Sequence, residues 1–124
     1  MVSLSRIYTA IKLKVLSVLK KGNFILGQEL AEFEKEFAKY CGVKHAIGVG
    51  SGTEAILIAL RALEIGRGNE VIVPANTFIS GVVPILYVGA KPVLVDINPE
   101  TYNIDVNTIE ERITKRSSIS WRIY

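Results

Sequence analysis

Short apolar runs alternate with longer segments of helical periodicity through the last two-thirds of the chain. The runs cover residues 46–49, 70–73 and 92–95, and helical spacing returns over 54–63 and 77–88. Glycine or proline follows the first two runs, and each run has the length of a buried strand. Strands that alternate with helices of about ten residues are typical of a mainly parallel sheet with right-handed crossovers. The sequence therefore predicts an α/β fold with about three mainly parallel strands.

Two amphipathic helices are expected before any strand, over residues 5–21 and 29–40, and Gly22 and Gly42 should end them. The connection over 23–28 carries Phe24, Ile25 and Leu26 between glycines, which predicts a loop with exposed apolar side chains. Such loops commonly contact a partner surface. The helix over 77–88 is expected despite Gly81 and Pro84, because proline is tolerated near a first turn or at a kink.

Composition narrows the function classes. The 124 residues suit one domain, and 49% of them are hydrophobic, which is enough for an ordinary core. The net charge of +3 is scattered rather than gathered into a basic stripe, so nucleic acid is not an expected partner. No apolar stretch reaches the roughly 20 residues of a membrane span, and a single cysteine excludes an intrachain disulfide. We expect a cytoplasmic protein that does not enter a membrane.

The turn Gly50-Ser51-Gly52-Thr53 lies between an expected strand and an expected helix. Glycine allows a tight turn and a close ligand approach, and the first amides of a helix lack partners and carry partial positive charge. A phosphate would suit that position. The alternative is that Ser51 or Thr53 simply caps the helix, with Glu54 favoured in its first turn. The glycine spacing matches neither the dinucleotide fingerprint nor the phosphate-binding loop of nucleotide triphosphatases.

A second polar cluster, residues 74–78, follows the strand over 70–73. Ligands of open α/β sheets bind beyond the carboxyl ends of strands, so Phe78 could contact a flat cofactor there, although a core role is the simpler interpretation. His45 precedes a strand and therefore lies at the wrong end of the sheet for this site. Cys41 is expected to be a small buried thiol. We predict no catalytic residue and no metal ligand in this chain.

The chain contains several motifs in the order in which they occur in a known family. This order favours the ligand-binding interpretations of the turn and of Phe78 over the structural ones. The chain resembles the DegT-type nucleotide-sugar aminotransferases, pyridoxal-phosphate enzymes of the aspartate aminotransferase fold, over about residues 16–116. The matching segments are FILG (24–27), GVKHA (42–46), GSGT (50–53), EVIVPANTF (70–78), GAKPV (89–93), VD (95–96) and TYNID (101–105).

The resemblance assigns roles to individual residues. It implies that the Gly52 and Glu54 amides and the Thr53 hydroxyl hold the cofactor phosphate, and that Phe78 stacks on the pyridine ring. It also implies that the loop over 23–28 approaches an active site built at a dimer interface. Asp96 at a strand end and Asp105 near a helix start are expected to be structural.

The resemblance also predicts what the chain lacks. In the family a downstream lysine forms the Schiff base with the cofactor, and a later aspartate pairs with the pyridine nitrogen; no segment here matches either. We therefore expect residues 1–116 to form part of the large domain of such an enzyme, and residues 117–124 to be a tail unlike the family. The expected function is that of an amino-terminal fragment, inactive alone, of an enzyme that moves an amino group from an amino acid, glutamate in the simplest case, to a nucleotide-linked keto sugar. The alternative is a non-catalytic regulatory or phosphate-binding remnant. Pyridoxal phosphate is not expected to bind stably to the fragment.

The same reasoning predicts how the sheet is completed. The strand over 46–49 would pair directly with that over 70–73, giving the strand order three, two, one. The remaining exposed edge, the helices and the loop over 23–28 would then drive association into a homo-oligomer.

Overall fold

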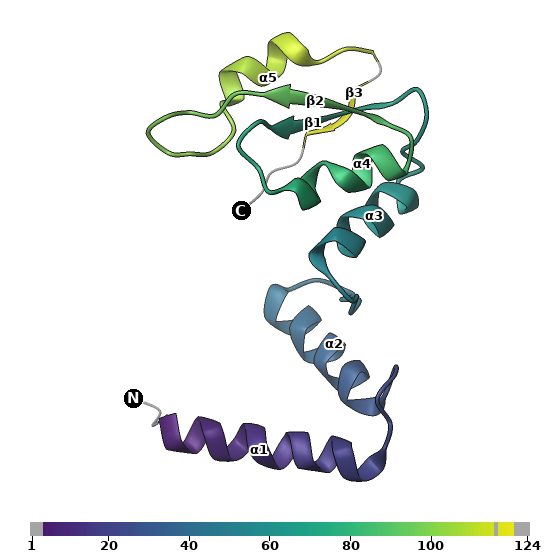
Figure 1. The fold of residues 1–124 in the computed structure, drawn as a ribbon, viewed down its shortest axis with the longest axis vertical. Helices are drawn as coiled ribbons and strands as arrows, with labels where there is room; N and C mark the ends of the chain where they lie inside the picture. The colour runs from purple at the N-terminus through teal and green to yellow at the C-terminus, as the bar shows by residue number, and fades with distance from the viewer. Residues whose placement is uncertain (1–3, 116, 121–124) are drawn as a thin grey trace. The chain divides into compact units, whose positions relative to one another are not determined.

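The computed structural model describes residues 4–115 and 117–120 (Figure 1). They divide into two compact units, Met1–Gly48 and Val49–Tyr124, and each is considered by itself. No helix in the described part of the chain combines the length and the apolar character that crossing a membrane requires.

The first unit consists of helices α1 (Leu4–Lys21) and α2 (Gln28–Cys41), which confirms the two helices expected from the sequence. Glycine ends both of them: Gly22 and Gly42 each adopt a φ of 68°, in the left-handed region that a residue with a Cβ rarely enters. At Gly42 the backbone amide turns back to the last carbonyls of α2. The helix boundaries are therefore set by local backbone chemistry.

An ion pair joins the end of α1 to the start of α2. Lys21 Nζ lies 2.6 Å from Glu29 Oε1. The hydrogen bond with Glu29 raises the pKa of Lys21. The bond with Lys21 is the main cause that lowers the pKa of Glu29, and the hydrogen bond with the Glu29 backbone adds to it. Each ionised side chain thus stabilises the other.

We expect this pair to titrate as a unit. The lowered pKa of Glu29 gives stability that is present above the ordinary glutamate pKa and is lost as pH falls through the lowered value. The raised pKa of Lys21 gives stability that is present below the ordinary lysine pKa and is lost as pH rises through the raised value. In a Lys21→Met variant the Glu29 carboxyl should titrate at a higher pH than in the parent, as followed by side-chain carbon NMR. An unchanged Glu29 titration curve would contradict the pairing. Lys20→Met is the control, because Lys20 precedes Lys21 and takes no part in the pair.

Cys41 is exposed at the end of α2, so the expectation of a buried thiol was wrong. Within α2 the buried residue is Ala38, and the three residues that follow it to the end of the helix, Cys41 among them, are exposed. His45 is exposed as well, in the irregular stretch after α2.

The expected strand over residues 46–49 is not formed. A strand exists only where its amide and carbonyl groups meet a neighbouring strand. Here the Gly48 amide instead donates to Glu34 Oε1 of α2 at 2.6 Å. Gly48 lies so close to α2 that a Cβ at this position would meet Leu30 Cδ1 at 2.6 Å. This stretch is therefore attached to a helix and not to the sheet.

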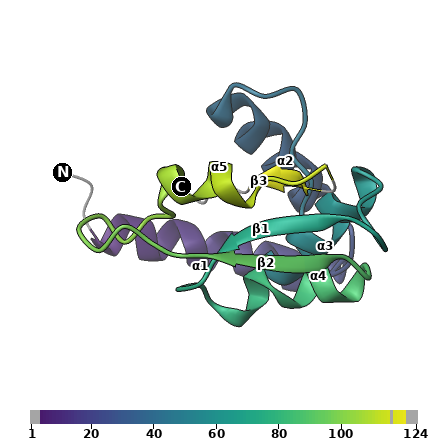
Figure 2. The same ribbon diagram turned by 90° about the horizontal axis from the view of Figure 1, so that it is seen from above.

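The second unit is the α/β part. It contains α3 (Gly52–Ala62), β1 (Glu70–Pro74), the 3₁₀ helix η1 (Ile79–Gly81), α4 (Val83–Tyr87), β2 (Lys91–Val95), α5 (Val106–Arg112) and β3 (Ser117–Ser120). The sheet has the order β2-β1-β3, and both pairings are parallel. Within this unit α3 and α4 lie on one side of the sheet and α5 on the other (Figures 1 and 2). The predicted α/β class is confirmed.

The strand order corrects one detail of the prediction. The place beside β1 that we assigned to residues 46–49 is taken by β3, which lies in the stretch expected to be a tail. The helix expected over 77–88 is also divided, into η1 and α4. Pro84 stands in the first turn of α4, where its missing amide costs no helical hydrogen bond, and so the proline begins a new helix after Gly81.

The core of the second unit gathers under β1. Leu60 of α3 and Ile85 of α4 are fully buried against Val71 and Val73 of β1. Ile65 and Ala90, in the connections that lead to β1 and β2, complete this cluster. The core therefore fixes α3 on the sheet, and with it the turn at the start of α3.

Candidate functional site

The turn before α3 is organised by its own side chains. Ser51 is the N-cap residue, with φ −161° and ψ 162°, and its hydroxyl accepts a hydrogen bond from the Glu54 amide at 3.2 Å. Glu54 Oε2 in turn accepts from the Gly50 amide at 2.9 Å. This reciprocal arrangement is close to a capping box. The capping role, which the sequence left open as an alternative, is present in the structure.

Besides the capping bonds, the same turn has backbone amides that are free to bind an anion. The amides of Gly52 and Thr53 stand in the first turn of α3, where no intrahelical acceptor exists, and among the described residues neither has another acceptor. A Cβ built on Gly52 would meet nothing within 4 Å, so the space before it is open. The helix dipole places partial positive charge at this point. A phosphate group therefore fits at Gly52 and Thr53.

Glu54 affects that capacity in two ways. Its amide is already bonded to Ser51 Oγ, so a phosphate bound there would have to share or replace this bond. Its carboxylate lies beside Gly50, where an added Cβ would be 2.6 Å from Oε2, and a negative charge so close to the turn repels an anion. Sequence reasoning placed Glu54 in the first turn and missed its carboxylate contact, although the Ser-x-x-Glu spacing signals it.

Phe78 lies at the carboxyl end of β1, as predicted, and its side chain is 78% exposed. It immediately precedes η1, and its carbonyl accepts from the Gly81 amide at 2.8 Å. Because η1 contacts α3, Phe78 lies directly before an element that packs beside the helix that carries the turn. The exposed ring does not serve the core, so the simpler of the two interpretations of Phe78 does not hold. An aromatic face is therefore available to a ligand.

The lysines of the second unit lie at the other end of the strands. Lys91 begins β2, and its ammonium group pairs with Glu70 at the start of β1, 3.0 Å away. Lys115 lies just before β3. Phe78 follows the carboxyl end of β1, so neither amine is placed to join a ring stacked on it.

Two aspartates have the structural positions expected of them. Asp105 is the N-cap of α5, and its carboxylate accepts from the Asn107 amide at 3.0 Å. Asp96 follows β2 and accepts from the Ile97 amide at 2.9 Å. In residues 4–115 and 117–120, no three histidine, cysteine, aspartate or glutamate side chains are grouped in a way that could hold a metal ion.

Comparison with known proteins gives this α/β unit its context. The chain belongs to the DegT/DnrJ/EryC1/StrS aminotransferase family, whose model matches residues 6–120. It is 51% identical over 100 residues to the dTDP-3-amino-3,6-dideoxy-alpha-D-galactopyranose transaminase of Aneurinibacillus thermoaerophilus, a match that covers 81% of this chain and 28% of the transaminase.

Solved structures agree with this assignment. NtdA from Bacillus subtilis, with bound cofactor PMP, has a TM-score of 0.86 and 37% identity; the match covers 96% of this chain and 27% of NtdA. DesV of S. venezuelae, in complex with a ketimine intermediate, has a TM-score of 0.85 and 38% identity, with 95% and 33% of the two chains covered. The chain thus spans about a third or less of the length of the proteins that it matches.

The family match also bears on the carboxyl-terminal stretch. It continues to residue 120, and β3 at Ser117–Ser120 belongs to the sheet. The division of the structure into units falls at Gly48 and Val49. The boundary that we predict after residue 116 stays a prediction.

Proposed function

We propose that this chain is the amino-terminal part of a pyridoxal-phosphate-dependent nucleotide-sugar aminotransferase, and that it contributes the phosphate contact and the ring-stacking residue of the cofactor site. The observation that carries the proposal is the open turn at the start of α3, where the Gly52 and Thr53 amides have no acceptor among the described residues. A relative suggests which ligand the turn binds, because the structure of NtdA contains the bound cofactor PMP.

The residues have separate tasks in this proposal. The Gly52 and Glu54 amides and the Thr53 hydroxyl hold the phosphate, and the Phe78 ring orients the pyridine plane. When bound, the cofactor supplies an electron sink that lets an amino group leave one carbon and join another. The amino donor is an amino acid, glutamate in the simplest case, and the acceptor is a keto sugar carried on a nucleotide.

The 124-residue chain by itself is proposed to be inactive and to hold the cofactor only weakly. Support comes from the lysines of the second unit, which stand at the amino ends of the strands, away from Phe78. A homo-oligomer in the cytoplasm, without nucleic acid or membrane as a partner, completes the proposal. A cofactor-binding remnant without catalysis is the second candidate, and the free turn favours it as much as it favours the first.

A chimera tests the first candidate. Residues 1–116 would be joined to the segment of the Aneurinibacillus thermoaerophilus transaminase that follows its matching region. We expect the chimera to bind pyridoxal phosphate and to transfer the amino group of glutamate to that enzyme's keto sugar. Thr53→Ala should weaken cofactor binding by about 10- to 100-fold, since a hydrogen bond to a charged group contributes about 1.5–3 kcal/mol and each 1.4 kcal/mol is tenfold.

Thr108→Ala in α5 is the control, because the Thr108 hydroxyl bonds to the Asp105 carbonyl and takes no part in the turn. A folded chimera that binds no cofactor would count against the proposed site. One that binds the cofactor equally well with and without the Thr53 hydroxyl would remove the assigned role of Thr53.

A further inference from the structure

The two glycines of the turn before α3 have different surroundings. A Cβ built on Gly52 would meet nothing within 4 Å, so this side of the turn is open to a ligand. A Cβ built on Gly50 would lie 2.6 Å from Glu54 Oε2, so the carboxylate occupies the place that a side chain would take there. Glycine at position 50 thus makes room for the chain's own carboxylate, whereas glycine at position 52 leaves room for a ligand.

Glu54 also holds the hydrogen-bond donor at the filled side of the turn. The Gly50 amide donates to Glu54 Oε2 at 2.9 Å, while the Gly52 and Thr53 amides have no acceptor among the described residues. Within residues 4–115 and 117–120 the Glu54 carboxylate forms no ion pair with a basic side chain, so its negative charge is not neutralised locally. The turn therefore presents free amides on one side and a negative charge on the other.

This arrangement suits one phosphate and disfavours two that are joined. A single phosphate needs only the donors of residues 52–54, as in the proposed function. A second phosphate linked to the first gains no backbone amide if it points to solvent. If it points toward Gly50, it meets an amide that is already bonded and a carboxylate that repels it. The glycine-rich turns that hold a chain of phosphates add a lysine, but the basic residue of α3 is Arg61 in its last turn, roughly 13 Å along the helix from Gly52.

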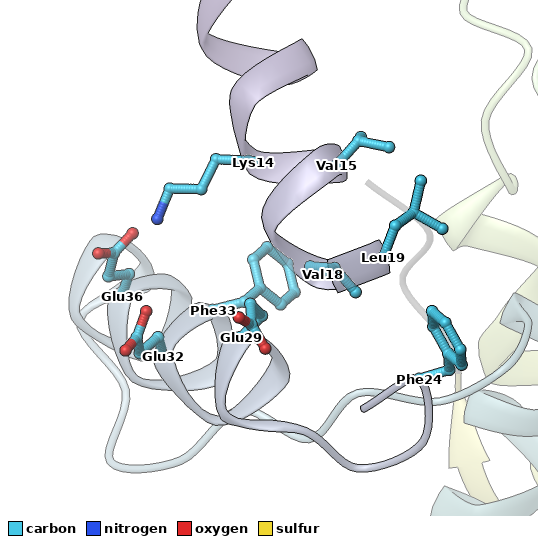
Figure 3. A pocket seen from close by; sticks show the side chains of 9 residues that line it. All are labelled: Lys14, Val15, Val18, Leu19, Phe24, Glu29, Glu32, Phe33 and Glu36. Atoms are coloured by element: carbon cyan, nitrogen blue, oxygen red, sulfur yellow. The ribbon is translucent and has the colours of Figure 1, made fainter. Parts of the chain in front are cut away.

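The groove of the first unit is not an alternative site for a phosphate. It has a volume of about 430 Å³ and lies between α1 and α2, where apolar side chains of α1 and the Phe33 ring of α2 face it (Figure 3). Its lining also contains Glu29, Glu32 and Glu36, against one basic residue, Lys14. This excess of negative charge repels a phosphate, so we expect phosphate-bearing ligands to bind at the turn before α3 and not in this groove.

We propose that Glu54 determines which phosphate the turn accepts: its carboxylate admits a single terminal phosphate, such as that of pyridoxal phosphate, and excludes two joined phosphates. The inference rests on the proposed function, in which the enzyme meets both kinds of ligand, a cofactor with one phosphate and a sugar carried on a nucleoside diphosphate. Both are anions that the start of a helix attracts. The carboxylate keeps the diphosphate of the substrate out of the turn that binds the cofactor.

Two small anions test this selectivity in the 124-residue chain. Inorganic phosphate and inorganic pyrophosphate, titrated separately without divalent metal, are followed through the Gly52 and Thr53 amide resonances in nitrogen-proton NMR spectra. We expect phosphate to shift both resonances saturably, and pyrophosphate to bind no more tightly despite its greater charge. The measured quantity is the ratio of the two dissociation constants.

Two variants separate the charge of Glu54 from its hydrogen bond. Glu54→Gln removes the charge and keeps an oxygen that can accept from the Gly50 amide, so the cap at the start of α3 is retained. Glu54→Ala removes both. The ratio should move in favour of pyrophosphate by about 10-fold in Glu54→Gln, and further in Glu54→Ala, where the Gly50 amide is freed.

Glu64→Gln is the matched control, because it makes the same charge change at an exposed position beyond the other end of α3 and should leave the ratio unchanged. Circular dichroism confirms that each variant keeps its helices.

The inference is overturned if pyrophosphate binds the parent chain more tightly than phosphate does. It is overturned as well if Glu54→Gln and Glu54→Ala change the ratio no more than Glu64→Gln does. In both cases phosphate still shifts the Gly52 and Thr53 resonances, and the proposed function stands. If neither anion shifts these resonances in any variant, the proposed phosphate site fails and the inference fails with it.

Discussion

The 124-residue chain, incubated with pyridoxal phosphate and glutamate, should form no saturable lysine adduct and should transfer no amino group. The physical reason is one of placement. A lysine can join the cofactor only if its amine reaches a ring held by Phe78, and in the second unit Lys91 is paired with Glu70 at the opposite end of β1. We expect absorbance spectra without a band that saturates with cofactor, and no keto acid from glutamate above the rate of free pyridoxal phosphate.

Random surface reaction of lysines is the main background in this experiment. Borohydride reduction followed by peptide mapping separates the two cases, because background reaction spreads over many lysines at low occupancy. One lysine labelled stoichiometrically, together with turnover of glutamate, would refute the expectation. It would also show that the chain carries a catalytic amine that neither the sequence nor the strand positions reveal.

Leu60→Ala should destabilise the second unit by about 3 kcal/mol, within the range of about 2–5 kcal/mol for leucine truncation in a core. Leu60 is 0% exposed and is the buried residue of α3 in the core cluster, against which Ile56 of the same helix also packs. Truncation leaves a cavity between α3 and the sheet, so the turn at Gly52 should lose its fixed position as well. A unit of this size has a small core, and the loss is a large part of its stability.

Urea unfolding followed by far-ultraviolet circular dichroism measures the effect. Leu63→Ala is the matched control: it removes the same atoms three residues later, where the side chain is 58% exposed, and should change the unfolding free energy by a few tenths of a kcal/mol. Equal losses for the two variants would show that α3 is not anchored through Leu60.

The elements that sequence predicted well are those set by neighbouring residues. The bounds of α1 and α2 differ from expectation by at most one residue at each end, because apolar spacing and a following glycine are local signals. β1 and β2 were found for a similar reason, as short apolar runs beside glycine or proline. The stretch over 46–49 has the same local pattern and forms no strand, because pairing depends on which segment lies beside β1, and that place belongs to β3.

In the candidate site, too, features set by neighbouring residues could be predicted, and features set by packing between distant segments could not. The turn at Gly50 could be located from sequence, and the capping role of Ser51 follows from its place before a helix. The exposure of Phe78 could not be predicted, since burial depends on what the folded chain packs against a residue. The prediction that Cys41 is buried was wrong for the same reason: cysteine is a residue type that is commonly buried, but the position of Cys41 at the end of α2 leaves it exposed to solvent.

The strand order has a consequence for synthesis on the ribosome. β1 lies in the middle of the sheet and is the first of its three strands to be made. β2 pairs with one edge of β1 and β3 with the other, so among these three strands none has to be inserted between two that are already paired. The Glu70 carboxylate, at the start of β1, accepts a hydrogen bond from Lys91 at the start of β2 and another from the Thr114 hydroxyl, which precedes β3, at 2.8 Å. Glu70, which is synthesised before β2 and β3, is therefore the residue whose side chain fixes the position of both strands relative to β1.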